Sequence, residues 1–171
     1  MSARLLVFCL LPLAAADTIE QVRNEIVASY QRSLNALRRG DADAYLQMET
    51  ADWVSTVVGQ KPRTRQELEP FLRRDIAGRK PPADWSAVWM PDYERNPTVS
   101  GIPVYDVKVD GNTAVVLCLV GSTRTEVAGG TPRSVWTGSH VRDTWIATAL
   151  GWRRRQHEKL TINQRMVDGK P

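Results

Sequence analysis

The chain has 171 residues, of which 42% are hydrophobic and 25% are charged, and its formal net charge is +4. This length and composition fit a single domain whose core is large enough to be stable without disulfides or metals. The positive excess is modest for a nucleic-acid-binding domain, and we expect no binding of this kind.

The first 16 residues have the pattern of a signal peptide. Arg4 supplies the positive start, residues 5–13 form a short apolar run, and Ala14-Ala15-Ala16 is a small-residue cleavage site. The apolar run is too short to span a bilayer, which takes about 20 residues. We therefore expect cleavage before Asp17 and export to the periplasm or the medium. Residues 17–171 would form one domain with no stable membrane insertion.

A long helix is predicted for residues 18–39. Asp17 or Thr18 can cap its N-terminus, and Gly40 is a natural stop. A short second helix is expected just after this glycine. Apolar side chains recur at helical spacing and form one stripe along the first helix: Ile19, Val22, Ile26, Tyr30, Leu34 and Leu37.

A third helix is indicated by the capping box that Thr64 and Glu67 form. Pro70 is unfavourable inside a helix because it lacks the amide hydrogen of a normal helical residue. We therefore expect the regular helix to begin at Glu69, with Pro70 in its first turn, and to end near Gly78.

The remainder of the chain is predicted to be strand. Asp110-Gly111-Asn112 and Gly129-Gly130 are turn signals, and the tail after Asn163 has the composition of surface chain. Helices followed by an antiparallel sheet indicate an α+β fold with the helices on one sheet face. The predicted strands cover residues 53–58, 85–90, 102–109 and 113–121, followed by a long hairpin over 139–160.

The hairpin register decides which side chains share a face. We place Trp145 opposite Trp152, across a loop at residues 147–150. The face that continues into Leu160 and Ile162 is taken as the interior one. On that face the register pairs Asp143 with Arg154, Val141 with Gln156 and Ser139 with Glu158, whereas His140 meets His157 on the other face.

Charged groups on an interior face predict a polar pocket, because they are costly to bury unless paired or hydrated. Asp143 with Arg154 fits either an acid–base site or a structural ion pair, which would keep Asp143 a poor base. Glu158 is a candidate base if it lies unpaired in an apolar cavity. The candidate catalytic residues are thus Asp143 and Glu158, and the candidate ligand contacts are Tyr30, Trp53, Tyr105, Trp145, Trp152, Arg154 and Gln156.

His140 and His157 could begin a metal site, but a carboxylate would have to complete it, because no third histidine is present. We therefore predict no metal and no cofactor. The chain also has no serine in a Gly-x-Ser-x-Gly arrangement and no glycine-rich phosphate loop before a helix.

Five short motifs occur in an order and spacing that resemble a known group: Gly40-Asp41-Ala42-Asp43, Asp52-Trp53, Thr64-Arg65-Gln66-Glu67, Arg142-Asp143-Thr144-Trp145 and Gly151-Trp152-Arg153. The chain resembles the SnoaL-like group of the nuclear transport factor 2-like superfamily, which includes the ketosteroid isomerases. The resemblance implies a cone-shaped, curved antiparallel sheet with about three N-terminal helices on its concave face, a cystatin-like α+β barrel. It also implies a ligand cavity and dimers through the outer sheet face.

Individual residues follow the resemblance only in part. Tyr30 resembles the first-helix tyrosine that donates to the oxyanion in ketosteroid isomerases. Their general-base aspartate falls in a region where this chain offers only Asp52, so isomerase activity is in doubt. His140 and Asp143 resemble the histidine and aspartate of cyclase members. Because residues three apart on a strand face opposite ways, at most one of the two lines the cavity.

Two functions follow as hypotheses. The first is an exported protein that binds a small, largely apolar molecule, with or without cofactor-free acid–base chemistry of the isomerase, cyclase or dehydratase type. The second is a non-catalytic dimerisation or interaction module whose cavity is filled. An enclosed cavity of about 300 Å³ or more favours the first. An exposed patch containing Trp136 and Ile146 with Val88 or Trp89 would suit a homodimer interface.

Overall fold

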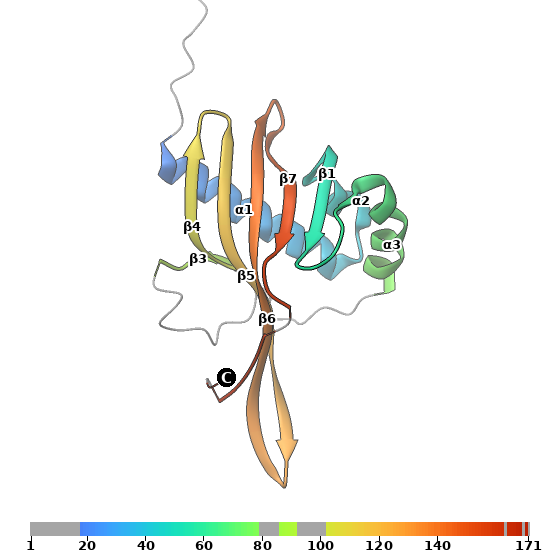
Figure 1. The fold of residues 1–171 in the computed structure, drawn as a ribbon, viewed down its shortest axis with the longest axis vertical. Coiled ribbons are helices and arrows are strands. Elements are labelled where there is room, and N and C mark those ends of the chain that lie inside the picture. The colour runs from blue at the N-terminus through green and yellow to red at the C-terminus, as the bar shows by residue number, and fades with distance from the viewer. Residues whose placement is uncertain (1–17, 79–85, 92–101, 163, 169, 171) are drawn as a thin grey trace, which may run out of the picture.

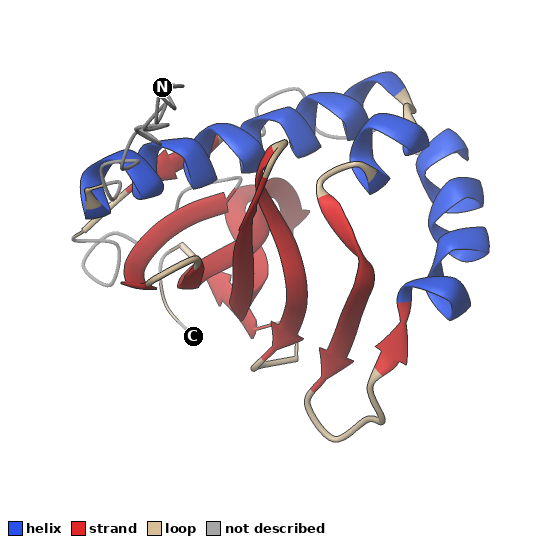
Figure 2. Ribbon diagram, turned by 90° about the horizontal axis from the view of Figure 1, so that it is seen from above, coloured by secondary structure: helices blue, strands red, loops and turns tan. Residues whose placement is uncertain are grey.

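The computed structural model describes residues 18–78, 86–91, 102–162, 164–168 and 170. The signal peptide predicted for residues 1–16 lies outside this part of the chain. Within it, no helix is both long enough and apolar enough to cross a membrane. Its three helices precede most of the strands in the chain. The long first helix lies across one face of a curved sheet, and the third helix lies at the edge of the sheet (Figure 2).

The first helix follows the sequence prediction closely. α1 (Ile19–Arg39) is capped by Thr18, whose hydroxyl accepts from the Gln21 amide at 3.2 Å, while the Gln21 side chain accepts from the Thr18 amide at 2.7 Å. Gly40 ends the helix in the left-handed conformation, with φ at 67°. α2 (Ala42–Leu46) follows at once, and Asp41 caps it. The side chains of α1 that face the sheet include Val22, Ile26, Tyr30 and Leu34.

The predicted start of the third helix is wrong. α3 (Arg65–Gly78) begins directly after Thr64, the first residue of the capping box, and Pro70 lies inside the helix. The Glu67 carboxylate accepts from the Thr64 amide at 2.7 Å, so the first turn is closed before the proline is reached. Pro70 cannot bond the carbonyl of Gln66, but both residues are exposed, so water can satisfy that carbonyl.

The sheet is mixed. The described strands lie in the order β2-β1-β7-β6-β5-β4-β3, with β8 paired to β6. We expected antiparallel pairing throughout, but β1 runs parallel to β7 and β3 runs parallel to β4. β8 also forms in the tail that we predicted to be surface chain. The bounds are β1 (Glu49–Val57), β2 (Arg63–Thr64), β3 (Ala87–Trp89), β4 (Ile102–Asp110), β5 (Thr113–Ala128), β6 (Thr131–Thr148), β7 (Gly151–Lys159) and β8 (Gln164–Val167).

The main core lies between α1 and the concave side of the sheet. Side chains from α1 meet alternate residues of β4, β5, β6 and β7 there, as the period of a strand requires. This layout confirms the predicted α+β class with helices on the concave face. The fully buried sheet residues of this core include Val104, Ala114, Val116, Cys118, Val141 and Trp145.

β5 and β6 continue beyond the body as a two-stranded arm, with Gly129 and Gly130 at its tip (Figure 1). At its base, the Trp136 ring lies over Gly121 and Gly138 on the outer sheet face. A Cβ added at Gly138 would lie only 2.3 Å from Trp136 Cζ2. Trp136 is therefore only 2% exposed, and the exposed patch that would suit a dimer interface does not include it. Met90, Tyr105 and Met166 pack around it and Leu119.

The predicted register of the β6–β7 hairpin is wrong by two residues at the turn. Thr148 pairs with Gly151 and Ala147 with Trp152, so Trp145 lies opposite Arg154 instead of Trp152. The loop has two residues, not four, because β6 extends by two further residues, to Thr148, while β7 begins at Gly151 as predicted. A shift of two positions preserves the face of every side chain, so Arg154 still points to the interior.

A β-bulge then reverses the face of the rest of β7. The pairing steps from Trp145 opposite Arg154 to Thr144 opposite Gln156, and Asp143 pairs with His157. One extra residue on a strand turns every later side chain to the other side. His157 therefore points to the interior, where we predicted Gln156 and Glu158 instead.

Candidate functional site

Arg154 lies at the centre of a buried cluster of charges. Its Nη1 is 3.1 Å from Asp143 Oδ2, and its Nε is 3.0 Å from Glu49 Oε2. Nη2 donates to the other oxygen of Glu49 and, at 3.3 Å, to the Tyr45 hydroxyl. Both carboxylates are fully buried and the guanidinium is 8% exposed. Every partner therefore holds the guanidinium in one orientation in a medium of low dielectric.

The cluster keeps Asp143 ionised. Burial alone raises the pKa of this carboxyl, but the charges of Arg154 and His157 outweigh it and lower the pKa to about 2. The Tyr30 hydroxyl donates to Asp143 Oδ2. Burial, and then the negative charge of Asp143, raise the pKa of Tyr30 well above its ordinary value. Tyr30 therefore stays protonated, and its hydroxyl donates its one hydrogen bond to Asp143.

His157 lies on the other side of the same carboxylate. Its Nδ1 is 2.8 Å from Asp143 Oδ1, and its side chain is 23% exposed. An ionised carboxylate only accepts hydrogen bonds, so Nδ1 carries the proton in this contact. In the neutral ring Nε2 then keeps its lone pair, and no described residue binds it. This arrangement gives the site an oriented base, and sequence reasoning missed it because nothing local signals the bulge.

A cavity of about 180 Å³ opens beside His157 and Arg154, between α1 and the sheet. It is smaller than the roughly 300 Å³ that we set as favouring a ligand site. It is nevertheless not filled, and its size suits a compact ligand. Four apolar side chains and several hydroxyls surround the charged end. The lining residues are Tyr30, Ser33, Leu34, Leu37, Tyr45, Ile102, Val120, Gly121, Arg154 and His157.

Of the proposed ligand contacts, Tyr30 and Arg154 line this cavity, and Asp143 lies directly behind them. The three tryptophans of the prediction are buried but are not among its lining residues. Trp145 packs edge-on against Tyr30, with ring centroids 5.1 Å apart, and so holds that tyrosine in place. Trp53 and Trp152 are buried to a similar degree.

Three predicted site residues point away from the cavity. Beyond the bulge, Gln156 and Glu158 face outward, where Glu158 pairs with Arg142 at 3.2 Å and Gln156 bonds to Thr144 at 3.2 Å. The third, Tyr105, packs on the outer sheet face. The prediction that these side chains project into the cone is wrong. For Gln156 and Glu158 the cause is the extra residue in β7.

His140 and His157 lie on opposite faces of the sheet, so their predicted pairing is wrong. On the outer face, His140 Nδ1 is 3.0 Å from the Tyr105 hydroxyl. On the interior face, His157 instead pairs with Asp143. In the described part of the chain, no group of three histidine, cysteine, aspartate or glutamate side chains could hold a metal ion.

Comparison with known proteins gives structural relatives only. No family model and no curated protein matches the sequence. A protein from Kribbella flavida is 18% identical with a TM-score of 0.55, covering 86% of this chain and 95% of its own. A nuclear transport factor 2-like superfamily protein from Salmonella enterica is 15% identical with a TM-score of 0.52, covering 82% and 91%. A putative aromatic ring hydroxylase from Novosphingobium aromaticivorans is 17% identical with a TM-score of 0.52, covering 88% and 96%.

The chain therefore has the nuclear transport factor 2-like fold. This confirms the fold that its sequence motifs implied, and it is compatible with a ligand-binding cone domain. At these identities the likeness defines the fold alone, because one fold hosts many unrelated activities. The features that bear on function are the buried charges around Arg154 and the cavity beside them.

Proposed function

We propose that this chain is an exported member of the SnoaL-like group that binds a compact, largely apolar molecule and moves a proton on it without a cofactor. One observation carries the proposal: His157 lines the cavity while Asp143 holds its Nδ1 at 2.8 Å. A histidine oriented by a buried carboxylate is a general base whose protonated form the carboxylate stabilises.

The roles of the residues follow from their hydrogen bonds. His157 Nε2 would accept a proton from a carbon next to a carbonyl, or return one to a leaving hydroxyl. Asp143 would stabilise the imidazolium that forms. The charge of Arg154 is taken up by Glu49 and Asp143, so its role would be to hold Asp143 and the Tyr45 hydroxyl in position. Reactions of the isomerase, cyclase and dehydratase types all use this step.

Tyr45 is the best-placed donor to a ligand oxygen. Its hydroxyl accepts from Arg154 at 3.3 Å, so its own proton stays available, and burial raises its pKa. Tyr30 cannot serve in this way while it donates to Asp143. The oxyanion donor that the resemblance assigns to Tyr30 would then be Tyr45 in this chain. Sequence reasoning missed Tyr45 because its apolar-face position on α2 indicated packing only.

The proposal can be tested by proton exchange. Compact uncharged ketones would be incubated with the protein in D₂O, and deuterium uptake next to the carbonyl would be followed by NMR. We expect uptake that falls about 100-fold or more in His157→Ala, the usual effect of losing a general base. His140→Ala is the matched control and should retain the activity, since His140 lies on the outer face. Equal rates in wild type and His157→Ala would refute the proposed base.

The second hypothesis is a non-catalytic module, and it needs its own test because the cavity of about 180 Å³ is neither filled nor as large as 300 Å³. Mass spectrometry of molecules that co-purify with the protein separates the two. A retained small molecule that is lost in His157→Ala but kept in His140→Ala supports the ligand site, whereas an empty wild-type protein that catalyses no exchange supports the module.

Under either hypothesis we also propose dimerisation through the outer sheet face. Sedimentation of the purified protein tests it.

A further inference from the structure

A second hollow lies outside the cone, where the end of α2 and the start of β1 face the tip of the β6–β7 hairpin. It is an open groove of about 570 Å³, within the volume range of small-molecule sites. Four of its ten lining residues are apolar: Leu46, Ala51, Ala149 and Leu150. The others are Gln47, Thr50, Thr148, Arg65, Arg153 and Glu49, whose carboxylate is paired with Arg154. Leu150, in the two-residue loop, is 79% exposed.

One wall of the groove is a free strand edge. β1 and β7 pair from Glu49 and Arg154 onward, and the Arg154 amide donates to Met48 O at 2.8 Å. Residues 151–153 therefore have no described strand beside them on that side. Amides of alternate residues point the same way along a strand, so the Trp152 amide points to this same unpaired side of β7.

Two guanidinium groups line the same groove. Arg65 is fixed, because its Nη1 donates to the carbonyls of Glu49 and Thr50 at 3.1 Å each and its Nε pairs with Glu69 at 3.4 Å. Arg153 differs, since its Nη1 is buried and has no hydrogen-bond partner in the described part of the chain. The guanidinium of Arg153 therefore lacks the partners that fix Arg65, and a buried donor left unpaired is costly.

We propose that this groove binds a small organic anion, a carboxylate attached to an apolar body. The carboxylate would accept from the Arg153 guanidinium, and the body would lie along Ala149 and Leu150. Charge complementarity favours this class, because Arg65 is already neutralised by Glu69 whereas Arg153 has no counter-ion among the described residues. This site is separate from the cavity at His157 and does not depend on the function proposed there.

The test is a titration of ¹⁵N-labelled protein with hexanoate, followed by NMR. Hexanol supplies the same apolar body without the charge, and acetate supplies the charge without the body. We expect hexanoate to shift the amides of Ala51, Leu150 and Trp152, and either partial probe to bind at least tenfold more weakly. Arg153→Gln should weaken hexanoate binding about tenfold.

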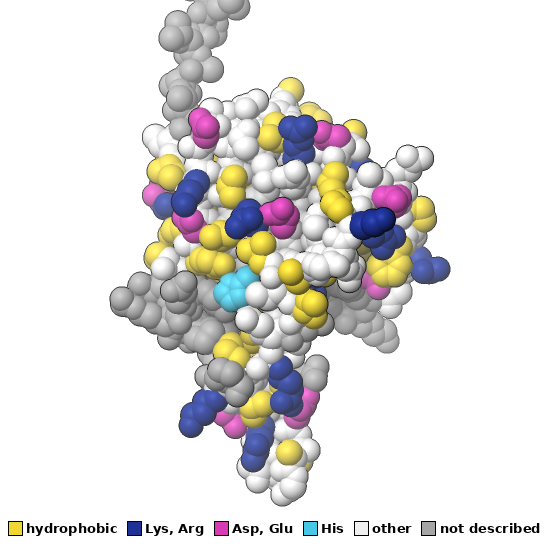
Figure 3. Space-filling model, viewed as in Figure 1, with side chains coloured by type: hydrophobic (Ala, Val, Ile, Leu, Met, Phe, Trp, Pro, Cys, Tyr) yellow, Lys and Arg dark blue, Asp and Glu magenta, His cyan; other side chains and the backbone are white. Residues whose placement is uncertain are grey.

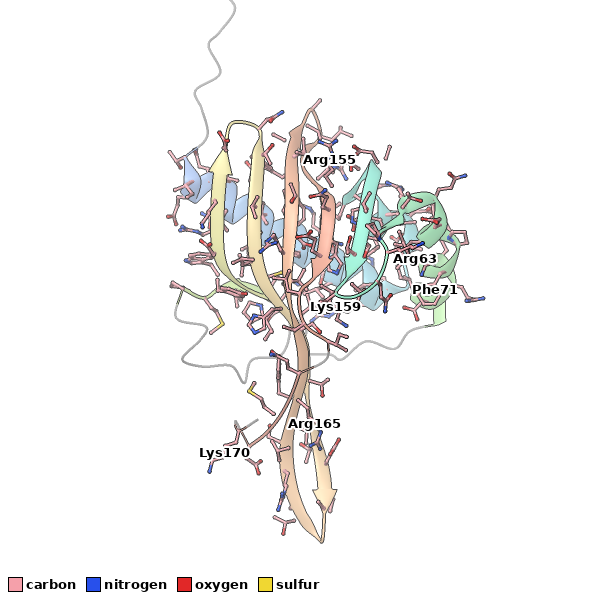
Figure 4. The ribbon with its side chains drawn as sticks, in the orientation of Figure 1. Arg63, Phe71, Arg155, Lys159, Arg165 and Lys170 are labelled. Carbon is pink, nitrogen blue, oxygen red and sulfur yellow. The ribbon has the colours of Figure 1, made fainter. Side chains whose placement is uncertain are left out.

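Arg155→Gln is the matched control. Arg155 lies two residues along β7 (Figure 4), and its guanidinium pairs with Asp52 at 3.0 Å. This variant removes the same charge from the same strand and should leave hexanoate binding unchanged. Equal weakening in both variants would reduce the effect to overall charge and overturn the site. So would hexanoate shifts that map to residues around His157, or the absence of any shift.

Discussion

Arg154 joins two buried carboxylates that could not remain charged without it. Asp143 and Glu49 have no exposed side-chain surface, and both bind the same guanidinium. Burial lowers the pKa of Arg154, but its two anionic partners raise it well above the ordinary value. The cluster is therefore an interdependent unit in which the loss of the cation leaves uncompensated charge.

Replacement of this cation should be strongly destabilising. We expect Arg154→Ala to lower the free energy of unfolding by about 3–5 kcal/mol, as for other buried ion pairs that lose one partner. Urea unfolding measures the change. Arg142→Ala is the control, because its pair with Glu158 is 49% and 39% exposed and should contribute less than about 1 kcal/mol. Similar losses in the two variants would show that the cluster is hydrated in solution.

The low pKa of Asp143 predicts a dependence of stability on acid. The pKa falls from 3.8 to about 2 on folding, so the folded state binds this proton less readily than the unfolded chain. The resulting contribution, about 2 kcal/mol, is present above pH 4 and is lost as the pH falls toward 2. Urea unfolding between pH 5 and pH 2.5 should show a shallower acid loss in Asp143→Asn than in wild type. Parallel curves would contradict the assignment.

Individual site residues could be predicted only as far as the strand register held. Asp143 and Arg154 were placed on the interior face correctly because a shift of two residues at the turn preserves the face. Glu158 was misplaced and His157 was missed because the bulge in β7 changes the face after Arg154. A bulge is set by packing across the sheet and has no dependable local signature, so no pattern of alternation could have located it.

Elements with local signals were predictable. The ends of α1 follow from the Thr18 cap and Gly40, and the β4–β5 turn follows from its Asp-Gly-Asn sequence. The parallel pairing of β1 with β7 was not predictable, because it joins segments about 100 residues apart through contacts that no local pattern records. β8 was missed for the same reason, since its short polar sequence pairs only because β6 offers an edge.

The base of the arm gives a prediction about one element. Trp136 packs on the bare backbone of Gly138, where an added Cβ would lie 2.3 Å from the ring. We expect Gly138→Ala to lower the free energy of unfolding by about 1–3 kcal/mol through overpacking. Gly78→Ala is the control, because nothing lies within 4 Å of its added Cβ. Thermal unfolding compares the two, and an unchanged midpoint for Gly138→Ala would show that the ring moves away freely.

At the scale of the molecule, the two sheet faces have different characters. The concave face carries the apolar core and the buried charges, whereas the outer face mixes hydrophobic, basic and acidic side chains (Figure 3). Arg165 and Lys170 lie beside the projecting arm (Figure 4), and Arg165 pairs with Glu126 at 2.9 Å. Trp136 is covered from within the chain, so a dimer through this face would have to use other side chains.

The central claim is that Asp143 fixes His157 as a base beside the cavity. The ¹⁵N chemical shifts of the His157 ring, recorded at a pH where the ring is neutral, test this claim most directly. We predict a protonated Nδ1 and an unprotonated Nε2, because the ionised carboxylate only accepts. A ring protonated on Nε2, or an equal mixture of the two tautomers, would contradict the account.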